Sequence, residues 1–209
     1  MTRLLVLDTE TGGIDSATQS VLSVGLVVWD DGQLVAQTEV LVAENPVVTT
    51  PEAMAVNRID LERHKAQALP PAVAVERIEQ FVAAHFGDAF EAGEKVVLAG
   101  HNIGFDIGFL KRLYRLTEMP FERRFSHRSV DTASIMRFLQ LCGLAPAEAL
   151  TSDGAFAFFG IEPALGDRHT ALGDARATAE LLQRLVGLVR ERNLGGGPHA
   201  SGDPSNGGD

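Results

Sequence analysis

The fold of this chain is restricted most by a short apolar segment that leads directly into two carboxylates. Residues 4–7 are apolar, and Asp8, Thr9 and Glu10 follow them. Because successive side chains of a strand point to opposite faces, Asp8 and Glu10 project on the same side. Two like charges at the end of a buried strand are unfavourable without a nearby cation. The segment therefore predicts a buried strand whose end binds a hard divalent metal ion through carboxylate oxygens.

Two further β-rich segments predict antiparallel partners for this strand. Residues 21–29 and 34–42 are rich in Val and Leu, and Asp30, Asp31 and Gly32 form a turn signal between them. These segments and the first strand are therefore expected to form three consecutive antiparallel strands.

Helical periodicity and shorter strands alternate in the rest of the chain. Thr50, Pro51 and Glu52 form a helix-start signal. We expect helices at 72–86, 105–116, 132–142, 148–159 and 170–192, strands at 96–99 and 129–132, and a surface loop at 87–95. The order β-β-β-α-β-α-β-α predicts an α/β fold with a sheet of mixed direction.

Length and composition predict one domain. The chain has 209 residues, of which 45% are apolar, so it can bury a full core without disulfide bonds. We expect the domain at residues 1–192 and a disordered, glycine-rich tail at 193–209. The single cysteine, Cys142, and the lack of a signal peptide or long apolar segment predict a cytoplasmic protein with no membrane contact.

The net charge of −10 argues against general binding of nucleic acids. Carboxylates that bind two divalent cations would offset up to four of these charges, however, and the distribution of charge matters more than its sum. Residues 111–128 contain six basic side chains against Glu118 and Glu122. This cluster predicts either a path for phosphates or a solvated helix face, and Phe121 and Phe125 within it are expected to pack in the core.

Three further groups could complete the acidic site. Asp106 ends the sequence HNIGFD and is expected in the first turn of a helix that follows a strand. His169 and Asp174 are five residues apart, about 140° around a helix, so they share a site only if His169 lies in the loop before the helix. Asp131 precedes Thr132 at a helix start and is interpreted as a cap.

In this order and at these separations, DTET at 8–11, HNxxFD at 101–106 and HxxxxD at 169–174 resemble the DEDDh 3′-to-5′ exonucleases. This family includes proofreading subunits of bacterial replicative polymerases, ribonuclease T and oligoribonuclease. The resemblance implies an RNase H-like fold, with a mixed five-stranded sheet, three leading antiparallel strands and flanking helices. The terminal histidine motif favours the histidine branch over the tyrosine branch.

The resemblance also implies the roles of individual residues. Two Mg²⁺ or Mn²⁺ ions would be held by four carboxylates, with Asp8 between them, and His169 would be the general base. The implied metal ligands are Asp8, Glu10, Asp106 and Asp174. The candidate substrate contacts are Thr9, Thr11, Gly12, Met54, Asn57 and Asn102. His101 is interpreted as a structural hydrogen-bonding residue.

The implied activity is stepwise hydrolysis of phosphodiester bonds at the 3′ end of single-stranded DNA or short RNA, with release of nucleoside 5′-monophosphates. Two alternatives stay open: a non-catalytic or weakly catalytic, polymerase-associated module that binds nucleic acid, and a metallophosphoesterase for small nucleotides. Residues 147–160 do not closely match the proofreading subunits, and the tail has no apolar residues for docking on a polymerase. Association with a polymerase, the preference for DNA or RNA, and the oligomeric state are left open.

Overall fold

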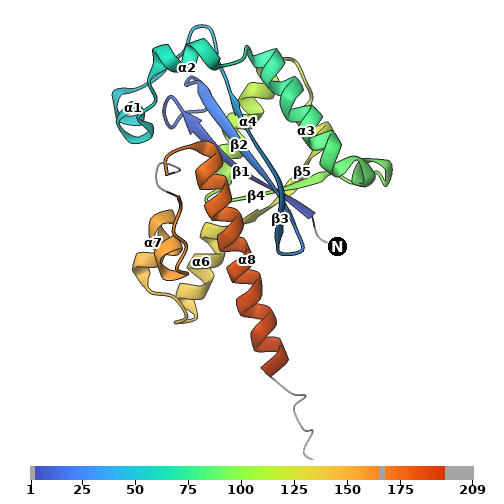
Figure 1. Ribbon diagram of the computed structural model, residues 1–209, viewed down its shortest axis with the longest axis vertical. Coiled ribbons are helices and arrows are strands. Elements are labelled where there is room, and N and C mark those ends of the chain that lie inside the picture. Colours follow the sequence, from blue (N-terminus) through green and yellow to red (C-terminus); the bar gives the residue numbers. More distant parts are fainter. Residues whose placement is uncertain (1–2, 165–167, 196–209) are drawn as a thin grey trace, which may run out of the picture.

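A five-stranded mixed sheet forms the centre of the molecule (Figure 1). The computed structural model describes residues 3–164 and 168–195, with side chains as far as residue 191. The strand order is β3-β2-β1-β4-β5, in which β1–β2 and β2–β3 are antiparallel and β1–β4 and β4–β5 are parallel. The strands are β1 (Arg3–Thr11), β2 (Val21–Asp30), β3 (Gln33–Leu41), β4 (Val96–Gly100) and β5 (Phe125–Asp131). The predicted mixed sheet with three leading antiparallel strands is confirmed.

Helices cover both faces of this sheet. They are α1 (Pro51–Asn57), α2 (Leu61–Gln67), α3 (Pro71–Glu91), α4 (Gly104–Leu116), α5 (Phe121–Arg124), α6 (Thr132–Leu141), the 3₁₀ turn η1 (Ala147–Leu150), α7 (Ser152–Phe158) and α8 (Ala171–Gly195). The start signal before α1 is confirmed, because the Thr50 hydroxyl accepts a hydrogen bond from the Ala53 N–H and Pro51 occupies the first turn.

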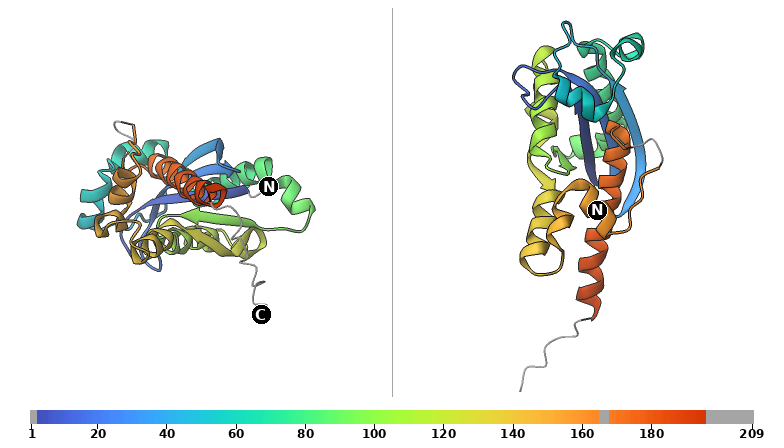
Figure 2. Two further views of the ribbon diagram at one scale, coloured as in Figure 1. Left: turned by 90° about the horizontal axis from the view of Figure 1, so that it is seen from below. Right: turned by 90° about the vertical axis from the view of Figure 1, so that its left-hand side faces the viewer.

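The alternation of side chains along β1 divides the core between two layers. Odd-numbered residues such as Leu5 pack with α3 and α4, whereas even-numbered residues such as Val6 pack with α8. Figure 2 shows α4 and α8 on opposite faces of the sheet. Asp8 and Glu10 therefore continue the face that α8 covers, and Thr9 continues the face that α4 covers.

The start of α8 lies directly on the middle of β2. Gly25 pairs with Asp8 across the sheet, and a Cβ atom at Gly25 would lie 2.1 Å from the carbonyl oxygen of Ala171. Only a residue without a side chain permits this approach. Gly25 thereby brings the first turn of α8 next to the acidic end of β1.

Three element boundaries differ from the prediction. The loop expected at 87–95 begins later, because α3 continues through a kink at Phe86 to Glu91, where the Phe90 ring packs against the core and under Arg124. The single helix expected at 148–159 is broken at Thr151, whose backbone is extended and whose hydroxyl caps α7. Strand β5 begins four residues before the expected 129, because Phe125 is buried.

The C-terminal boundary is also shifted. Helix α8 extends to Gly195, so residues 193–195, which were expected in the tail, are helical. The remainder of the expected tail, residues 196–209, lies outside the described residues. Among the described helices, none combines the length and the apolar character that crossing a membrane requires. The cytoplasmic location stays a prediction.

Candidate active site

Three of the predicted carboxylates meet at the end of β1. Asp8, Glu10 and Asp174 each place a carboxylate oxygen within 4.8 Å of the other two. Two of them come from β1 and the third from the first turn of α8. The contact between α8 and Gly25 therefore joins residues that are far apart in the sequence.

The fourth carboxylate, Asp106, lies beside these three and is held by β1 itself. Asp106 is buried in the first turn of α4, with 4% of its surface exposed. Its Oδ1 accepts hydrogen bonds from the Thr9 N–H at 2.9 Å and from the Thr9 hydroxyl at 2.7 Å. Thr9, expected to touch substrate, thus fixes the orientation of a candidate metal ligand.

All four carboxylates have raised pKa values. Burial raises the pKa of Glu10 to about 7, assisted by Asp174 and Glu39, and burial raises the pKa of Asp106 to about 7. Burial and the neighbouring Asp106 raise the pKa of Asp8 well above its usual range. Burial also raises the pKa of Asp174. A concentration of oxygen donors with too little positive charge suits hard divalent cations such as Mg²⁺ and Mn²⁺.

Arg168 supplies part of the missing positive charge, and the sequence did not predict it. Its guanidinium donates through Nη1 to Asp174 and through Nη2 to Asp153 of α7. It also lies over the ring of Phe156, 5.2 Å from the centroid. Arg168 lowers the pKa of Asp8, Glu10 and Asp174 and so partly opposes the effect of burial. Its position directly before His169 was the only available signal.

His169 lies in the turn before α8, as predicted. Its φ of 60° is left-handed, and its backbone N–H helps to lower the pKa of Asp174. Together with Glu10 and Thr170 it lines a groove of about 400 Å³ between α2 and the edge of the sheet. The imidazole and a candidate metal ligand thus face the same space, and the role of His169 as a base stays a prediction.

A larger cavity, of about 630 Å³, is also lined by Glu10. Three predicted substrate contacts, Thr9, Thr11 and Asn57, line it. The Asn57 side-chain amide donates to the carbonyl of Thr11 at 3.1 Å and thereby joins α1 to β1. The apolar part of the lining comes from Ile14, Ala53, Val56 and Phe105.

The other three predicted substrate contacts do not line this cavity. Gly12 is held between backbone neighbours: its N–H donates to the Ser20 carbonyl, and a Cβ there would lie 2.1 Å from the Val48 carbonyl oxygen. Met54 is half-buried on α1. Asn102 has a φ of 60° and lies in the loop between β4 and α4.

Asp131 is a cap, as its position predicted. Its Oδ1 accepts hydrogen bonds from the backbone N–H groups of Ala133, in α6, and of Asn102. It therefore fastens the loop before α4 to the start of α6. His101 contacts the hydroxyl of Thr132 at 3.1 Å, which fits its interpretation as a structural residue.

Three of the six basic side chains in the cluster at 111–128 form ion pairs. Lys111 pairs with Glu122, Arg112 with the buried Glu44, and Arg124 with Glu79, at 3.9, 2.8 and 2.6 Å.

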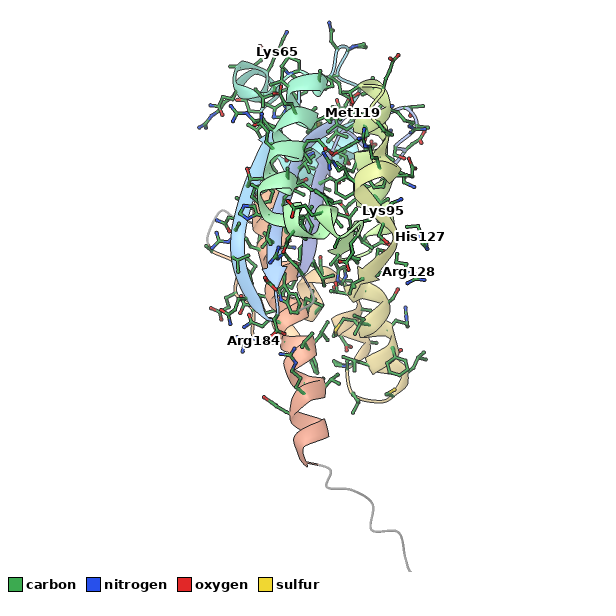
Figure 3. All side chains as sticks on the ribbon, turned by 90° about the vertical axis from the view of Figure 1, so that its right-hand side faces the viewer. Lys65, Lys95, Met119, His127, Arg128 and Arg184 are labelled. Carbon is green, nitrogen blue, oxygen red and sulfur yellow. The ribbon has the colours of Figure 1, made fainter. Side chains whose placement is uncertain are left out.

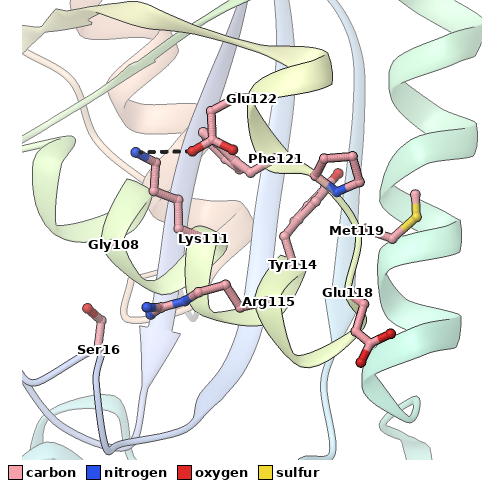
Figure 4. A pocket seen from close by; sticks show the side chains of 10 residues that line it. Ser16, Gly108, Lys111, Tyr114, Arg115, Glu118, Met119, Phe121 and Glu122 are labelled. Carbon is pink, nitrogen blue, oxygen red and sulfur yellow. Dashed lines mark ion pairs between the residues drawn. The ribbon is translucent and has the colours of Figure 1, made fainter.

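A cavity of about 630 Å³ lies beside α4. Figure 4 shows Lys111 facing Glu122 in its lining. Figure 3 places Arg128 at the surface of β5. Phe121 and Phe125 pack with Tyr114 in the core, as expected. These contacts favour a solvated, ion-paired surface over a continuous path for phosphates.

Comparison with known proteins places the chain in a family. A family profile described as "Exonuclease" matches residues 5–182. Ribonuclease T of Baumannia cicadellinicola subsp. Homalodisca coagulata is 27% identical over 198 residues, covering 92% of this chain and 86% of the relative. A DNA polymerase III subunit epsilon-like protein of Rhodobacter capsulatus is 29% identical over 191 residues, covering 91% of this chain but 24% of that protein.

The solved structures agree in fold. E. coli exonuclease I in complex with a dT13 oligonucleotide superimposes with a TM-score of 0.75 at 16% sequence identity. The match covers 93% of this chain and 43% of exonuclease I, so the chain spans less than half of that protein. The chain belongs to the exonuclease family, as its three motifs predicted, and is a 3′-to-5′ exonuclease.

Proposed function

We propose that this chain removes nucleotides one at a time from the 3′ end of single-stranded DNA or short RNA and releases nucleoside 5′-monophosphates. The observation that carries the proposal is the meeting of Asp8, Glu10 and Asp174 within 4.8 Å, with Asp106 beside them. These four carboxylates suit two Mg²⁺ or Mn²⁺ ions, because they offer oxygen donors and need positive charge nearby. When bound, such ions lower the pKa of an attacking water and stabilise the leaving 3′-oxygen.

His169 is proposed as the base that takes the proton from this water. His169 lines the same groove as Glu10, and its backbone lies close enough to Asp174 to lower the pKa of that carboxyl. Histidine is the side chain best suited to accept a proton at neutral pH. Attachment to the same turn as a metal ligand would keep the base close to the reacting water.

The cavity beside Glu10 is proposed as the seat of the terminal nucleotide. Ile14 and Val56 are apolar, 87% and 60% exposed, and both line it, so they offer a surface for a base. Thr9, Thr11 and Asn57 provide polar groups along the same wall. Gly12, Met54 and Asn102 do not line the cavity, and we assign them the role of holding its walls in place.

A second candidate is a proofreading role in association with a DNA polymerase. It is favoured by the similarity to the epsilon-like protein of R. capsulatus. A purely non-catalytic module has no need of a converging set of four carboxylates, which favours an active enzyme in either setting. Copurification of the tagged chain with a polymerase would support this candidate.

The proposal is tested with short 5′-labelled DNA and RNA oligonucleotides of the same sequence, in Mg²⁺, Mn²⁺ or a chelator. We expect a ladder of products that shorten from the 3′ end, and no products with the chelator. Asp8→Asn should show no cleavage above the chelator control because it removes a central ligand. Asp31→Asn removes an exposed carboxylate that pairs with Arg190 and should cleave normally.

His169→Gln separates binding from chemistry in the same assay. It should bind Mn²⁺ as the wild type does but turn over about 10²–10⁴-fold more slowly, as expected when a general base is lost. Full activity of Asp8→Asn would refute the proposed metal site. An unchanged rate for His169→Gln would refute the role of His169 as general base.

A further inference from the structure

We propose that Arg168 is a resident counter-ion, which occupies Asp174 until a divalent ion displaces it and is then retained by Asp153. The inference rests on the proposed metal site, since it concerns what competes for that site. It assigns a role to two residues, Arg168 and Asp153, that are not among the candidate metal ligands.

The contacts of Arg168 combine one partner inside the acidic cluster with two outside it. Nη1 donates to Asp174, whereas Nη2 donates to Asp153 and the guanidinium lies over Phe156. The side chains of Arg168 and Asp174 are 24% and 16% exposed, and that of Asp153 is 74% exposed. The fork of the guanidinium therefore spans the boundary between the cluster and the solvent.

A divalent ion at Asp174 and the guanidinium at the same carboxylate compete with each other. Both bind to carboxylate oxygens, and the repulsion between a single and a double positive charge is unfavourable in a partly buried site. Arg168 already lowers the pKa of Asp8, Glu10 and Asp174, so its charge acts on the whole cluster. A divalent ion bound at Asp174 is therefore expected to displace this charge.

The partners on α7 provide a place for the displaced guanidinium. Asp153 and Phe156 lie one turn apart, and neither belongs to the cluster of three carboxylates. Because the two nitrogens of Arg168 bond to different carboxylates, Arg168 can release Asp174 and keep Asp153. The Phe156 ring supports the cation in both positions.

The bonds of Arg168 are not needed to hold α7 in place. Ala155 and Phe156 are buried in a core formed with α6 and α8, and this core holds α7 in place. An exposed ion pair such as that with Asp153 adds little to stability. Arg168, which bonds to both Asp153 and Asp174, instead connects α7 to the acidic cluster.

The test is titration of the full chain with Mn²⁺, with free Mn²⁺ measured by electron paramagnetic resonance. Arg168→Gln should bind Mn²⁺ about fivefold to tenfold more tightly, because no cation has to be displaced. Asp153→Asn should weaken binding, because the guanidinium loses its other anchor. The double variant should match Arg168→Gln, since Asp153 acts through Arg168.

Two further variants serve as controls. Arg190→Gln removes a charge from the same helix α8, where Arg190 pairs with Asp31, and should bind Mn²⁺ as the wild type does. Arg168→Lys keeps the charge without the fork, so its affinity should lie between those of the wild type and Arg168→Gln. Circular dichroism spectra establish that each variant is folded.

The outcomes separate this inference from the proposed function. Normal Mn²⁺ binding by the wild type with unchanged or weaker binding by Arg168→Gln overturns the inference and leaves the metal site intact. An effect of Asp153→Asn that persists in the absence of Arg168 also overturns it, because Asp153 would then act directly on the ion. Failure of the wild type to bind Mn²⁺ overturns both proposals.

Discussion

Asp8, Thr9 and Glu10 are neighbours in the chain but act on opposite sides of the sheet. Thr9 uses its N–H and hydroxyl to hold Asp106 on the α4 side, whereas Asp8 and Glu10 face Asp174 of α8. The alternation of a strand thus allows three consecutive residues to unite two helices at one site.

The raised pKa values of two of these carboxylates predict how stability depends on pH without metal. The pKa values of Glu10 and Asp106 are about 7, against ordinary values of 4.5 and 3.8. Between the ordinary values and 7, the folded protein keeps protons that the unfolded chain has lost. Raising the pH through this window therefore lowers the free energy of unfolding.

Calorimetry in a chelator should accordingly give a lower melting temperature above pH 7 than near pH 5. Asp106→Asn, which cannot ionise but can still accept the Thr9 bonds, should flatten this dependence. An equally steep decline in Asp106→Asn would show that Asp106 does not contribute to it. Saturating Mg²⁺ should reverse the trend, because protons then compete with the ion.

Sequence motifs predicted the residues of the acidic site better than its polar surroundings. Asp8, Glu10 and Asp174 were identified because carboxylates at strand and helix ends have few uses other than metal binding or capping. Arg168 was missed because its partner Asp153 is defined only by the packing of α7. The backbone of Gly12 is packed under Val48, and its contact with a nucleotide stays a prediction.

Helix α8 owes its position to one glycine of β2. A methyl group at Gly25 would meet the backbone of Ala171 at 2.1 Å, and backbone atoms cannot turn aside as a side chain can. Gly25→Ala should therefore lower the free energy of unfolding by about 1–3 kcal/mol and weaken Mn²⁺ binding by shifting Asp174.

Gly87→Ala is the matched control for this substitution in denaturation experiments. Gly87 lies in α3 with open space around its Cβ position, so alanine there should be neutral or slightly stabilising. Equal stability and equal Mn²⁺ affinity of Gly25→Ala and the wild type would mean that α8 is not positioned by this contact.

Local signals predicted where most elements begin, but long-range packing decided where several of them end. Thr50 and Pro51 correctly predicted the start of α1, because a helix cap depends only on residues within one turn. The extension of α3 beyond Phe86 depends on the contact of Phe90 with Arg124, which lies on a distant element. Periodicity alone also could not show that Thr151 adopts an extended backbone between η1 and α7.

The four candidate ligands come from β1, α4 and α8, so metal binding is expected to stabilise the fold as a unit. Mn²⁺ at about 100 times its dissociation constant should raise the free energy of unfolding by about 2.7 kcal/mol. Urea denaturation with and without Mn²⁺ measures this change, and amide exchange should slow at the start of α8. Asp174→Asn should show little of either effect, and an equal gain in that variant would place the ion elsewhere.

The order of elements and three motifs were enough to predict the sheet and the family. The parallel pairing of β4 with β5 follows from a helical connection, and the antiparallel pairing of β1 with β2 from a short one. The cavity beside Glu10 was not predictable, since its apolar wall combines Ile14, Val56 and Phe105 from three separate segments. These residues come together only when three segments pack around the sheet: the loop that follows β1, helix α1 and helix α4.

The late position of α8 in the chain has a consequence during protein synthesis. A growing chain that extends only through α7 lacks His169 and Asp174, and Leu4 and Trp29 are without the helix that buries them. The acidic cluster is incomplete at that stage. The ribosome therefore synthesises β1 to α7 before the acidic cluster can assemble, while the messenger RNA is still being read beside it.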